Sequence, residues 1–189
     1  MVMCSQDTGG KFVDESCEAH LLVYDVTVPD SVTVNVVFEV LAATRPSQVG
    51  KTFSERLSGE KASGKLLNLA LATRIITPAE REAARSGPFD LPDEKVLAMK
   101  SRQLCGKITM QRKQRQNPAT GQWEDDPSDP RSFAHINFDS YDVASDKARG
   151  IPKSAQFLAM MHGQPAPLAA PSAPAVPAVN AAPAPAMNW

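Results

Sequence analysis

The chain lacks the features that would place it in a membrane or outside the cell. It contains no run of about 18 apolar residues, the length that a transmembrane helix needs. Its first residues have neither the basic region nor the apolar region of a signal peptide. The three cysteines, Cys4, Cys17 and Cys105, follow no regular spacing, so no disulfide scaffold is expected. We therefore expect a cytoplasmic protein with no membrane partner.

Motifs of catalysis and of metal binding are also scarce. There is no G-x-S-x-G element and no G-x-x-x-x-G-K-[ST] phosphate loop. Cys17 and His20 have the gap of a metal half-site, but no second half follows. In a strand, positions i and i+3 also face opposite sides. We expect no enzyme, no metal site and no cofactor.

Charge of one sign does not dominate, because 20 basic and 21 acidic residues give a net charge of −1. The two signs are segregated, however. Residues 1–30 carry six acids and one base, residues 95–115 carry seven bases and no acid, and four acids follow within 124–129. A basic strip suits a polyanion, because each neutralised phosphate releases condensed counterions. A solvated basic face is the alternative interpretation.

Proline and alanine accumulate at the end of the chain. The last 27 residues, 163–189, hold 7 of the 16 prolines together with ten alanines and no charged residue. Such a composition cannot build a packed core. We predict a flexible N-terminus over 1–10, one domain over 11–158 and a disordered Pro/Ala-rich tail over 159–189.

The body of the chain begins with strand signals. Residues 17–28 and 32–43 are rich in β-branched residues, and the second run alternates with period two. The turn Pro29-Asp30-Ser31 joins them, which predicts a long antiparallel hairpin. Residues 51–57 predict a third strand.

Helix signals follow the third strand. Apolar spacing predicts a helix within 61–75, and Thr77-Pro78-Ala79-Glu80 has the pattern of a helix start with a capping box. Residues 93–101 predict another short helix.

Strand signals return over 104–112 and 133–143, on either side of a polar loop at 116–131. Three strands, a helical segment and two strands follow the element order of the OB-fold. The predicted fold is mainly β with a helical insertion: an OB-like five-stranded barrel with the helical segment between strands 3 and 4. An unrelated α+β sheet with the same element order is the alternative.

Cations and aromatic residues lie near the regions with which OB-folds bind oligonucleotides. Basic side chains there would follow the phosphates while rings stack on the bases. The acids Glu124, Asp125 and Asp126 would cap the loop or pair with the basic cluster when DNA is absent. The predicted contacts are Lys51, Arg56, Lys107, Arg112, Lys113 and Arg115 for phosphates, and Phe53 and Trp123 for bases. Core packing is an equal alternative for Phe53.

Three segments carry a resemblance to a known family. They are Val37–Leu41 followed by Gln48–Phe53, a helical segment with basic and apolar positions, and Ser101–Lys107 leading into a strand. With them, the stretch from about Lys11 to Lys153 resembles the small bacteriophage-type single-stranded-DNA-binding proteins, many of them labelled only as a domain of unknown function. The resemblance implies an OB-type barrel that holds single-stranded DNA during replication and recombination, without catalysis.

The tail departs from that resemblance. Many single-strand binders end in an acidic tail that recruits replication partners, whereas this tail is uncharged and ends in Trp189. We predict a non-catalytic single-stranded-DNA-binding protein of DNA replication, recombination or repair, with RNA as a second ligand class and homo-oligomers allowed. The alternative is an assembly module whose barrel is a scaffold and whose tail recruits replication or recombination proteins through Trp189.

Overall fold

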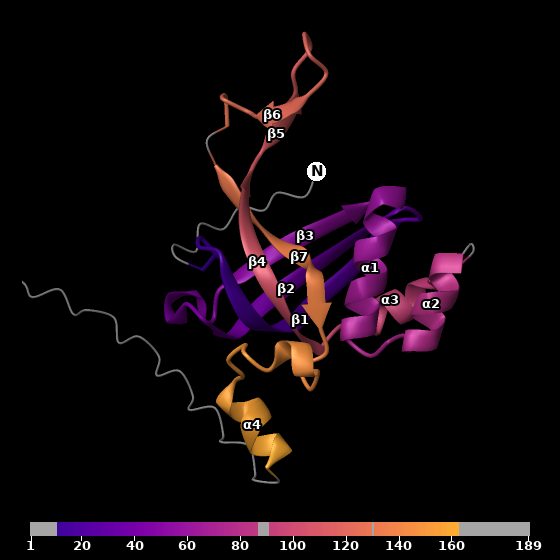
Figure 1. Ribbon diagram of the computed structural model, residues 1–189, viewed down its shortest axis with the longest axis vertical. Coiled ribbons are helices and arrows are strands. Elements are labelled where there is room, and N and C mark those ends of the chain that lie inside the picture. The colour runs from indigo at the N-terminus through magenta and orange to yellow at the C-terminus, as the bar shows by residue number, and fades with distance from the viewer. Residues whose placement is uncertain (1–10, 87–90, 130, 163–189) are drawn as a thin grey trace, which may run out of the picture.

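A strongly curved antiparallel sheet forms the centre of the computed structural model, which describes residues 11–86, 91–129 and 131–162 (Figure 1). The strands lie in the order β3-β2-β1-β4-β7. This mainly β architecture with helices between β3 and β4 confirms the coarse prediction. The strands of the sheet are β1 (Cys17–Asp30), β2 (Thr33–Ala43), β3 (Thr52–Ser58), β4 (Gln103–Arg112) and β7 (Ser132–Tyr141).

The predicted first hairpin is confirmed. β1 and β2 pair along almost their whole lengths, and the alternate residues Val34, Val36, Phe38 and Val40 of β2 are buried in the core. Asp30 closes the turn, because its Oδ1 accepts the backbone N–H of Val32 at 2.9 Å. The period-two pattern therefore predicted the buried face of this strand correctly.

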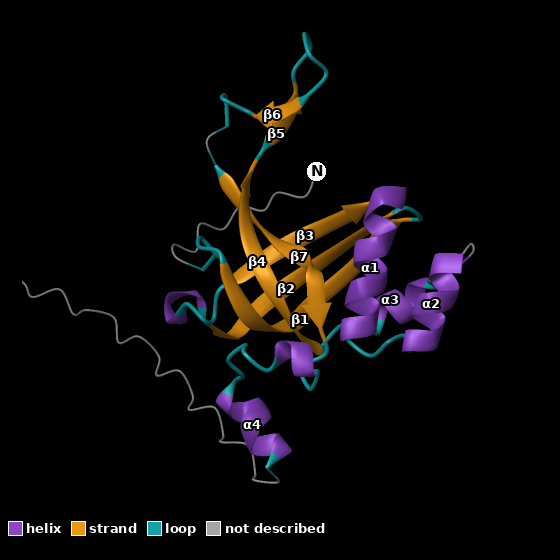
Figure 2. Cartoon of the chain, in the orientation of Figure 1, coloured by secondary structure: helices purple, strands orange, loops and turns teal. Residues whose placement is uncertain are grey.

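Three helices gather beside the sheet, while the last helix projects from it at the opposite end from the small hairpin formed within 114–125 (Figure 2). The predicted capping box is present: Thr77 Oγ1 accepts the N–H of Glu80 at 3.2 Å, and Glu80 Oε2 accepts the N–H of Thr77 at 2.7 Å. The α-helices are α1 (Glu60–Ala72), α2 (Pro78–Ser86), α3 (Asp93–Leu97) and α4 (Ala155–Met161), and the short 3-10 turns are Pro46–Gln48 and Asp146–Ala148.

The edge strands β3 and β7 approach each other without pairing as strands. Within the described ranges, no backbone ladder joins them, so the expected closed barrel is not confirmed. Side chains span the seam instead. Glu55 Oε2 of β3 accepts the N–H of Ile136 in β7 at 3.1 Å, and Asn68 Nδ2 of α1 donates to the carbonyl of Phe138 at 3.3 Å.

A bulge interrupts β7 halfway along the strand. Ile108 of β4 lies opposite Ile136, but Gly106 lies opposite Ser140, so four steps of β7 face two steps of β4. A Cβ at position 106 would lie 3.1 Å from Ile136 Cδ1, so any larger residue there would force the Ile136 side chain to shift. Bulges bend a strand and re-aim its side chains, and this one turns Phe138 outward, where it is 53% exposed.

The predicted polar loop at 116–131 is partly wrong, because it contributes to a second, small sheet. β5 (Gln114–Gln116) pairs with β6 (Trp123–Asp125), and the hairpin projects away from the main sheet (Figure 1). In its turn, the N–H of Asn117 donates a hydrogen bond to the carbonyl of Gln122 at 2.8 Å. The turn also contains Gly121, whose φ of +69° lies in the region that favours glycine. Because the strands are only three residues long, their alternation was too short to detect.

Ser154 is the N-cap of α4, and its Oγ accepts the N–H of Phe157 at 3.3 Å. The helix extends across the boundary expected between the domain and its tail at 158/159. The expected flexible N-terminus over 1–10 and the tail from 163 onward, including Trp189, lie outside the described residues. No helix in the described part of the chain is both long and apolar enough to cross a membrane.

Candidate nucleic-acid interface

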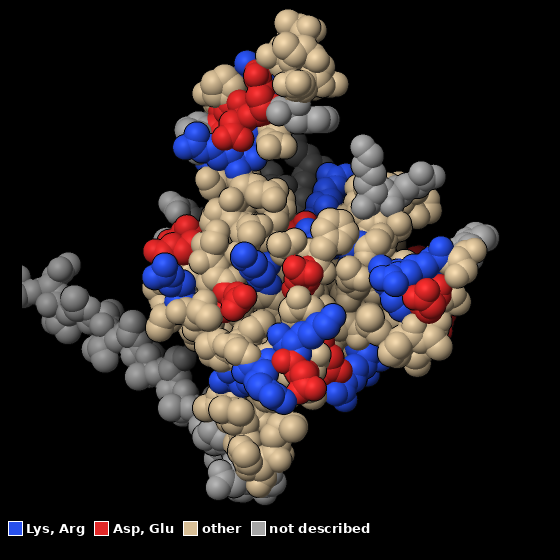
Figure 3. Space-filling view, viewed as in Figure 1, with Lys and Arg blue, Asp and Glu red and all other residues tan. Residues whose placement is uncertain are grey.

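The main concentration of predicted site residues lies on a projection that we call the arm, residues 111–133. It comprises the end of β4, the β5–β6 hairpin and the start of β7. Four cations and four carboxylates share the arm, and Figure 3 shows both signs side by side on it. The cations Arg112, Lys113, Arg115 and Arg131 have side chains between 50% and 74% exposed.

Two of these cations form loose pairs at the surface. Arg115 Nη2 lies 3.4 Å from Glu124 Oε1, and Arg112 Nη1 lies 4.0 Å from Asp125 Oδ2. Pairs this exposed contribute about 0–1 kcal/mol, because water screens the charges and the side chains lose entropy on pairing. Both guanidinium groups are therefore available to another anion at little cost.

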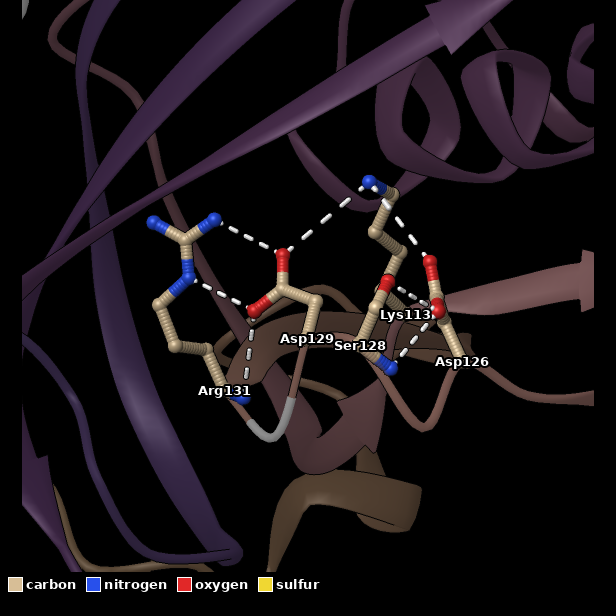
Figure 4. Close-up of polar contacts among 5 residues, drawn as sticks. All are labelled: Lys113, Asp126, Ser128, Asp129 and Arg131. Atoms are coloured by element: carbon tan, nitrogen blue, oxygen red, sulfur yellow. Dashed lines mark hydrogen bonds and ion pairs between the residues drawn. The ribbon is translucent and has the colours of Figure 1, made fainter.

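Lys113 is also held loosely, by two carboxylates (Figure 4). Its Nζ lies 3.9 Å from Asp126 Oδ2 and 4.0 Å from Asp129 Oδ2, beyond hydrogen-bond distance of either. The two carboxylates have better partners. Asp126 Oδ1 accepts from Ser128 Oγ at 2.6 Å, and Asp129 accepts from Arg131 Nε and Nη2 at 2.7 Å each. The Lys113 side chain can therefore turn to another anion while Asp126 and Asp129 keep these hydrogen bonds.

The same bonds stabilise the charged form of both carboxyl groups. The hydrogen bond from Arg131 lowers the pKa of Asp129 to about 2, and hydrogen bonds from Ser128 lower the pKa of Asp126. Both groups are therefore anionic across the physiological pH range. They keep this turn of the arm folded and oppose the approach of a phosphate.

An exposed ring accompanies the cations at the base of the arm. Phe133 is 42% exposed, and the guanidinium carbon of Arg131 lies 5.6 Å from its ring centroid. A ring with a cation at its face can stack an unpaired base while the cation meets the phosphate. The sequence-based selection missed both residues. The signal for them was the Arg-x-Phe spacing at the entry of a predicted strand.

Phe53 is not part of any exposed site, which corrects that prediction. It is 4% exposed, and its ring stacks on Phe38 with 5.0 Å between centroids and 24° between planes. The alternation of β3 points Phe53, Glu55 and Leu57 into the core and Ser54 and Arg56 outward. A base can reach Phe53 only if the core opens, so the core-packing alternative is the correct one.

The remaining predicted cations do not join the arm. Lys51, the residue before β3, has a side chain that is 15% exposed. Its Nζ lies 2.7 Å from Asp14 Oδ1. Arg56 pairs across the sheet with Asn35 and so with Thr27 of β1, whereas Lys107 lies opposite Glu18. Thr27 and Glu18 are nine positions apart on β1, so Arg56 and Lys107 lie at points of the sheet separated by roughly 30 Å of strand.

Of the two tryptophans predicted as site residues, the structure describes only the backbone of Trp123. The backbone of Trp123 lies in β6 opposite Gln116, which puts it on the arm. Its side chain, like all of Trp189, lies outside the described part of the structure. The arm therefore unites Arg112, Lys113 and Arg115 with the backbone of Trp123, and leaves Lys51, Phe53, Arg56 and Lys107 elsewhere.

An ionic cluster occupies the seam between β3 and β7. Glu55 Oε1 lies 2.6 Å from Lys65 Nζ and 3.4 Å from His135 Nδ1, and the Glu55 side chain is 5% exposed. Burial raises the pKa of Glu55, but hydrogen bonds from His135 and Lys65 outweigh it, and the pKa lies below its ordinary value. The cluster thus connects β3, α1 and β7 across the open side of the sheet.

The two described thiols are buried in separate apolar clusters. Cys17 and Cys105 are buried free thiols, and burial raises the pKa of both, which suppresses the nucleophilic thiolate. Among the described residues, no group of three His, Cys, Asp or Glu side chains converges as a metal site would require.

Comparison with family models and with curated proteins found no match for the chain. The resemblance to single-stranded-DNA-binding proteins therefore stays a prediction based on the residues themselves.

Proposed function

We propose that the protein binds single-stranded DNA without catalysis, as a factor of DNA replication, recombination or repair in the cytoplasm. The observation that carries this proposal is the arm. It projects from the sheet with four cations that are half or more exposed, and it has the half-exposed ring of Phe133 at its base. Cations interleaved with rings are what a sequence-tolerant single-strand binder uses.

The strand order supports the same proposal. In an OB-fold the neighbours run 3-2-1-4-5, with the helix between strands 3 and 4, and oligonucleotides contact the loop between strands 4 and 5. The order β3-β2-β1-β4-β7 follows this scheme if β7 is the fifth strand, and the arm is then the 4–5 loop. We propose an OB-like barrel whose seam is closed by side chains.

The carboxylates of the arm suggest how binding proceeds. With no ligand bound, Glu124, Asp125 and Asp126 lie 3.4–4.0 Å from Arg115, Arg112 and Lys113 respectively. A phosphate accepts stronger, charge-assisted hydrogen bonds from a guanidinium. An incoming strand therefore exchanges carboxylate partners for phosphate partners and releases its own counterions.

Fluorescence anisotropy with labelled oligo-dT at several salt concentrations tests the proposal. The triple variant Arg112→Gln/Lys113→Gln/Arg115→Gln should bind more weakly, and its plot of log affinity against log salt should be shallower by about 2, the value for three lost contacts. The matched control Lys95→Gln/Lys100→Gln/Arg149→Gln removes three cations from ion pairs outside the arm. It should bind as the native chain does.

The same titrations can also contradict the proposed DNA binding. A native chain that binds no oligo-dT at low salt, or binds it without a salt slope, overturns the proposal. The assembly-module interpretation, with Trp189 as the recruiting residue, then takes its place. Parallel titration with oligo-U separates DNA from RNA as the ligand.

A further inference from the structure

A groove of about 730 Å³ separates α1 and α2 from the bulged half of β7. Cations enter it from three segments: Arg74 from the end of α1, Arg85 from α2, and Lys147 from the 3-10 turn that follows β7. Phe138 and Tyr141 of β7 supply aromatic rings. No residue of this groove was selected from the sequence.

Phe138 is presented to the groove by two features of the fold. The bulge in β7 turns it outward, and Asn68 of α1 holds its backbone carbonyl at 3.3 Å. α1 passes close to the ring at Gly64, where an added Cβ would lie 3.9 Å from Phe138 Cε1. Despite this support the side chain stays 53% exposed. A large apolar ring that is fixed and yet half exposed suits a stacking platform.

Arg74 is oriented by the backbone and by a carboxylate. Its φ of +59° lies in the left-handed region that favours glycine, at the position just after a helix where glycine is common. Its Nε and Nη2 both donate to Asp142, the latter at 3.0 Å. Among the described residues, Nη1 has no partner, so the guanidinium can donate from Nη1 to a second anion.

The groove also has the more favourable charge. Its three cations face two carboxylates, Asp139 and Asp142, whereas the four cations of the arm face four carboxylates. Within the described part of the chain, Arg85 is engaged only by an exposed pair with Glu82 at 3.2 Å, and Lys147 Nζ lies over the Tyr141 ring at 5.8 Å. Arg85 and Lys147 can therefore turn toward a phosphate without leaving a buried acid unpaired.

A smaller groove of about 520 Å³ leads back toward the arm. Its lining includes Gln111, His135 and Phe138, so Phe138 borders both grooves. Gln111 pairs with Phe133 at the base of the arm. The two grooves thus follow β7 one after the other, from Gln111 beside Phe133, past the shared Phe138, to Tyr141, and we call this line the path.

We propose that this path carries the bound strand beyond the arm: a base stacks on Phe138, and the adjoining phosphates contact Arg74, Arg85 and Lys147. The inference depends on the proposed single-strand binding and names the second contact region of that site. It places the exit of the strand between α2 and the end of β7.

Oligo-dT of increasing length, from about 4 to about 16 nucleotides, tests the path, since OB-type sites span that range. The variants are Phe138→Ala and Arg85→Gln/Lys147→Gln. The matched controls are Tyr24→Ala, an aromatic side chain 60% exposed on β1, and Lys100→Gln/Arg149→Gln. Affinity of the native chain should rise with length until arm and groove are both occupied.

Phe138→Ala should weaken binding of the longest oligonucleotide roughly 5- to 150-fold, the range for loss of one stacked base, and change the shortest much less. Equal affinities of Phe138→Ala and Tyr24→Ala at every length, alongside weakened binding by the arm triple variant, overturn the path but leave the proposed function standing. Absence of binding by the native chain at low salt overturns both. Because Phe138 is half exposed, the variant should melt as the native chain does.

Discussion

His20 Nδ1 accepts the backbone N–H of Ser154 at 3.1 Å, across 134 positions of the chain. The other ring nitrogen, Nε2, lies 3.0 Å from Gln103 Oε1, so it is the protonated one. Ser154 is the N-cap of α4, and the His20 ring meets Phe157 of that helix edge to face at 5.3 Å. A neutral, buried imidazole therefore attaches the last helix to the sheet.

Acid should detach that helix. Burial lowers the pKa of His20 to about 4 in the folded chain, against 6.5 when exposed, so protons bind preferentially to the unfolded chain below pH 6.5. The free energy of unfolding should fall as the pH drops from 6.5 to 4, by up to about 3 kcal/mol. Urea unfolding at pH 7 and 4.5 measures this loss. Between these pH values His20→Gln should lose less unfolding free energy than the native chain, and His162→Gln should lose the same amount. Equal losses in all three chains would contradict the role of His20 in the acid sensitivity.

Phe53 should affect stability rather than DNA binding. Phe53→Ala removes the ring that stacks on Phe38 and should cost about 3–5 kcal/mol of unfolding free energy. Phe53→Leu keeps most of the buried volume, so it should fold and bind oligo-dT with native affinity. Thermal melts and anisotropy on the same samples separate the two effects. A folded Phe53→Leu chain that no longer binds would restore the stacking role.

Glu55 should hold the seam between β3 and β7. Glu55→Ala leaves Lys65 without its partner at 2.6 Å and frees the Ile136 N–H, so we expect a loss of about 3–5 kcal/mol. Hydrogen exchange should accelerate at Ile136. Glu94→Ala, an exposed acid on α3, is the control. An unchanged exchange rate at Ile136 in Glu55→Ala would show that another contact closes the seam.

Gly106 should be sensitive to a single methyl group. In Gly106→Ala the new Cβ meets Ile136 Cδ1 at 3.1 Å, and the overpacking should cost about 1–3 kcal/mol. Ile136→Val removes that Cδ1, so the double variant should recover part of the loss. Gly150→Ala, where a Cβ meets nothing within 4 Å, should melt as the native chain does. A Gly106→Ala chain of native stability would mean that β7 shifts freely.

The arm carboxylates should compete with DNA. Glu124→Gln/Asp125→Asn removes two anions that face Arg115 and Arg112, and should tighten oligo-dT binding several-fold at low salt, as expected for exposed pairs of up to about 1 kcal/mol each. The control Glu94→Gln/Asp146→Asn neutralises two acids outside the arm. Anisotropy at 50 and 200 mM salt should show the difference shrinking as salt rises. Weaker binding by the arm variant would mean that these acids stabilise the binding conformation.

Patterns within a few residues predicted much of this fold. The alternation of β2, the turn at Asp30 and the capping box of Thr77 and Glu80 were correct, because each depends on neighbours in the chain. The basic cluster Arg112–Arg115 was also found, and the structure places it on the arm. The short β5–β6 pair was missed, since three residues are too few to show a period.

The sequence by itself determined the five strands of the main sheet, the helical insertion and the segment that carries the exposed cations, because local backbone preferences and side-chain periodicity set these. Only the tertiary structure decided which side chains are available. Strand pairing buries Phe53 against Phe38, brings Glu55 to Ile136 across 81 positions, and exposes Phe138 at a bulge opposite Gly106. Such contacts join residues far apart in the chain, and the free energy of packing the whole sheet selects them.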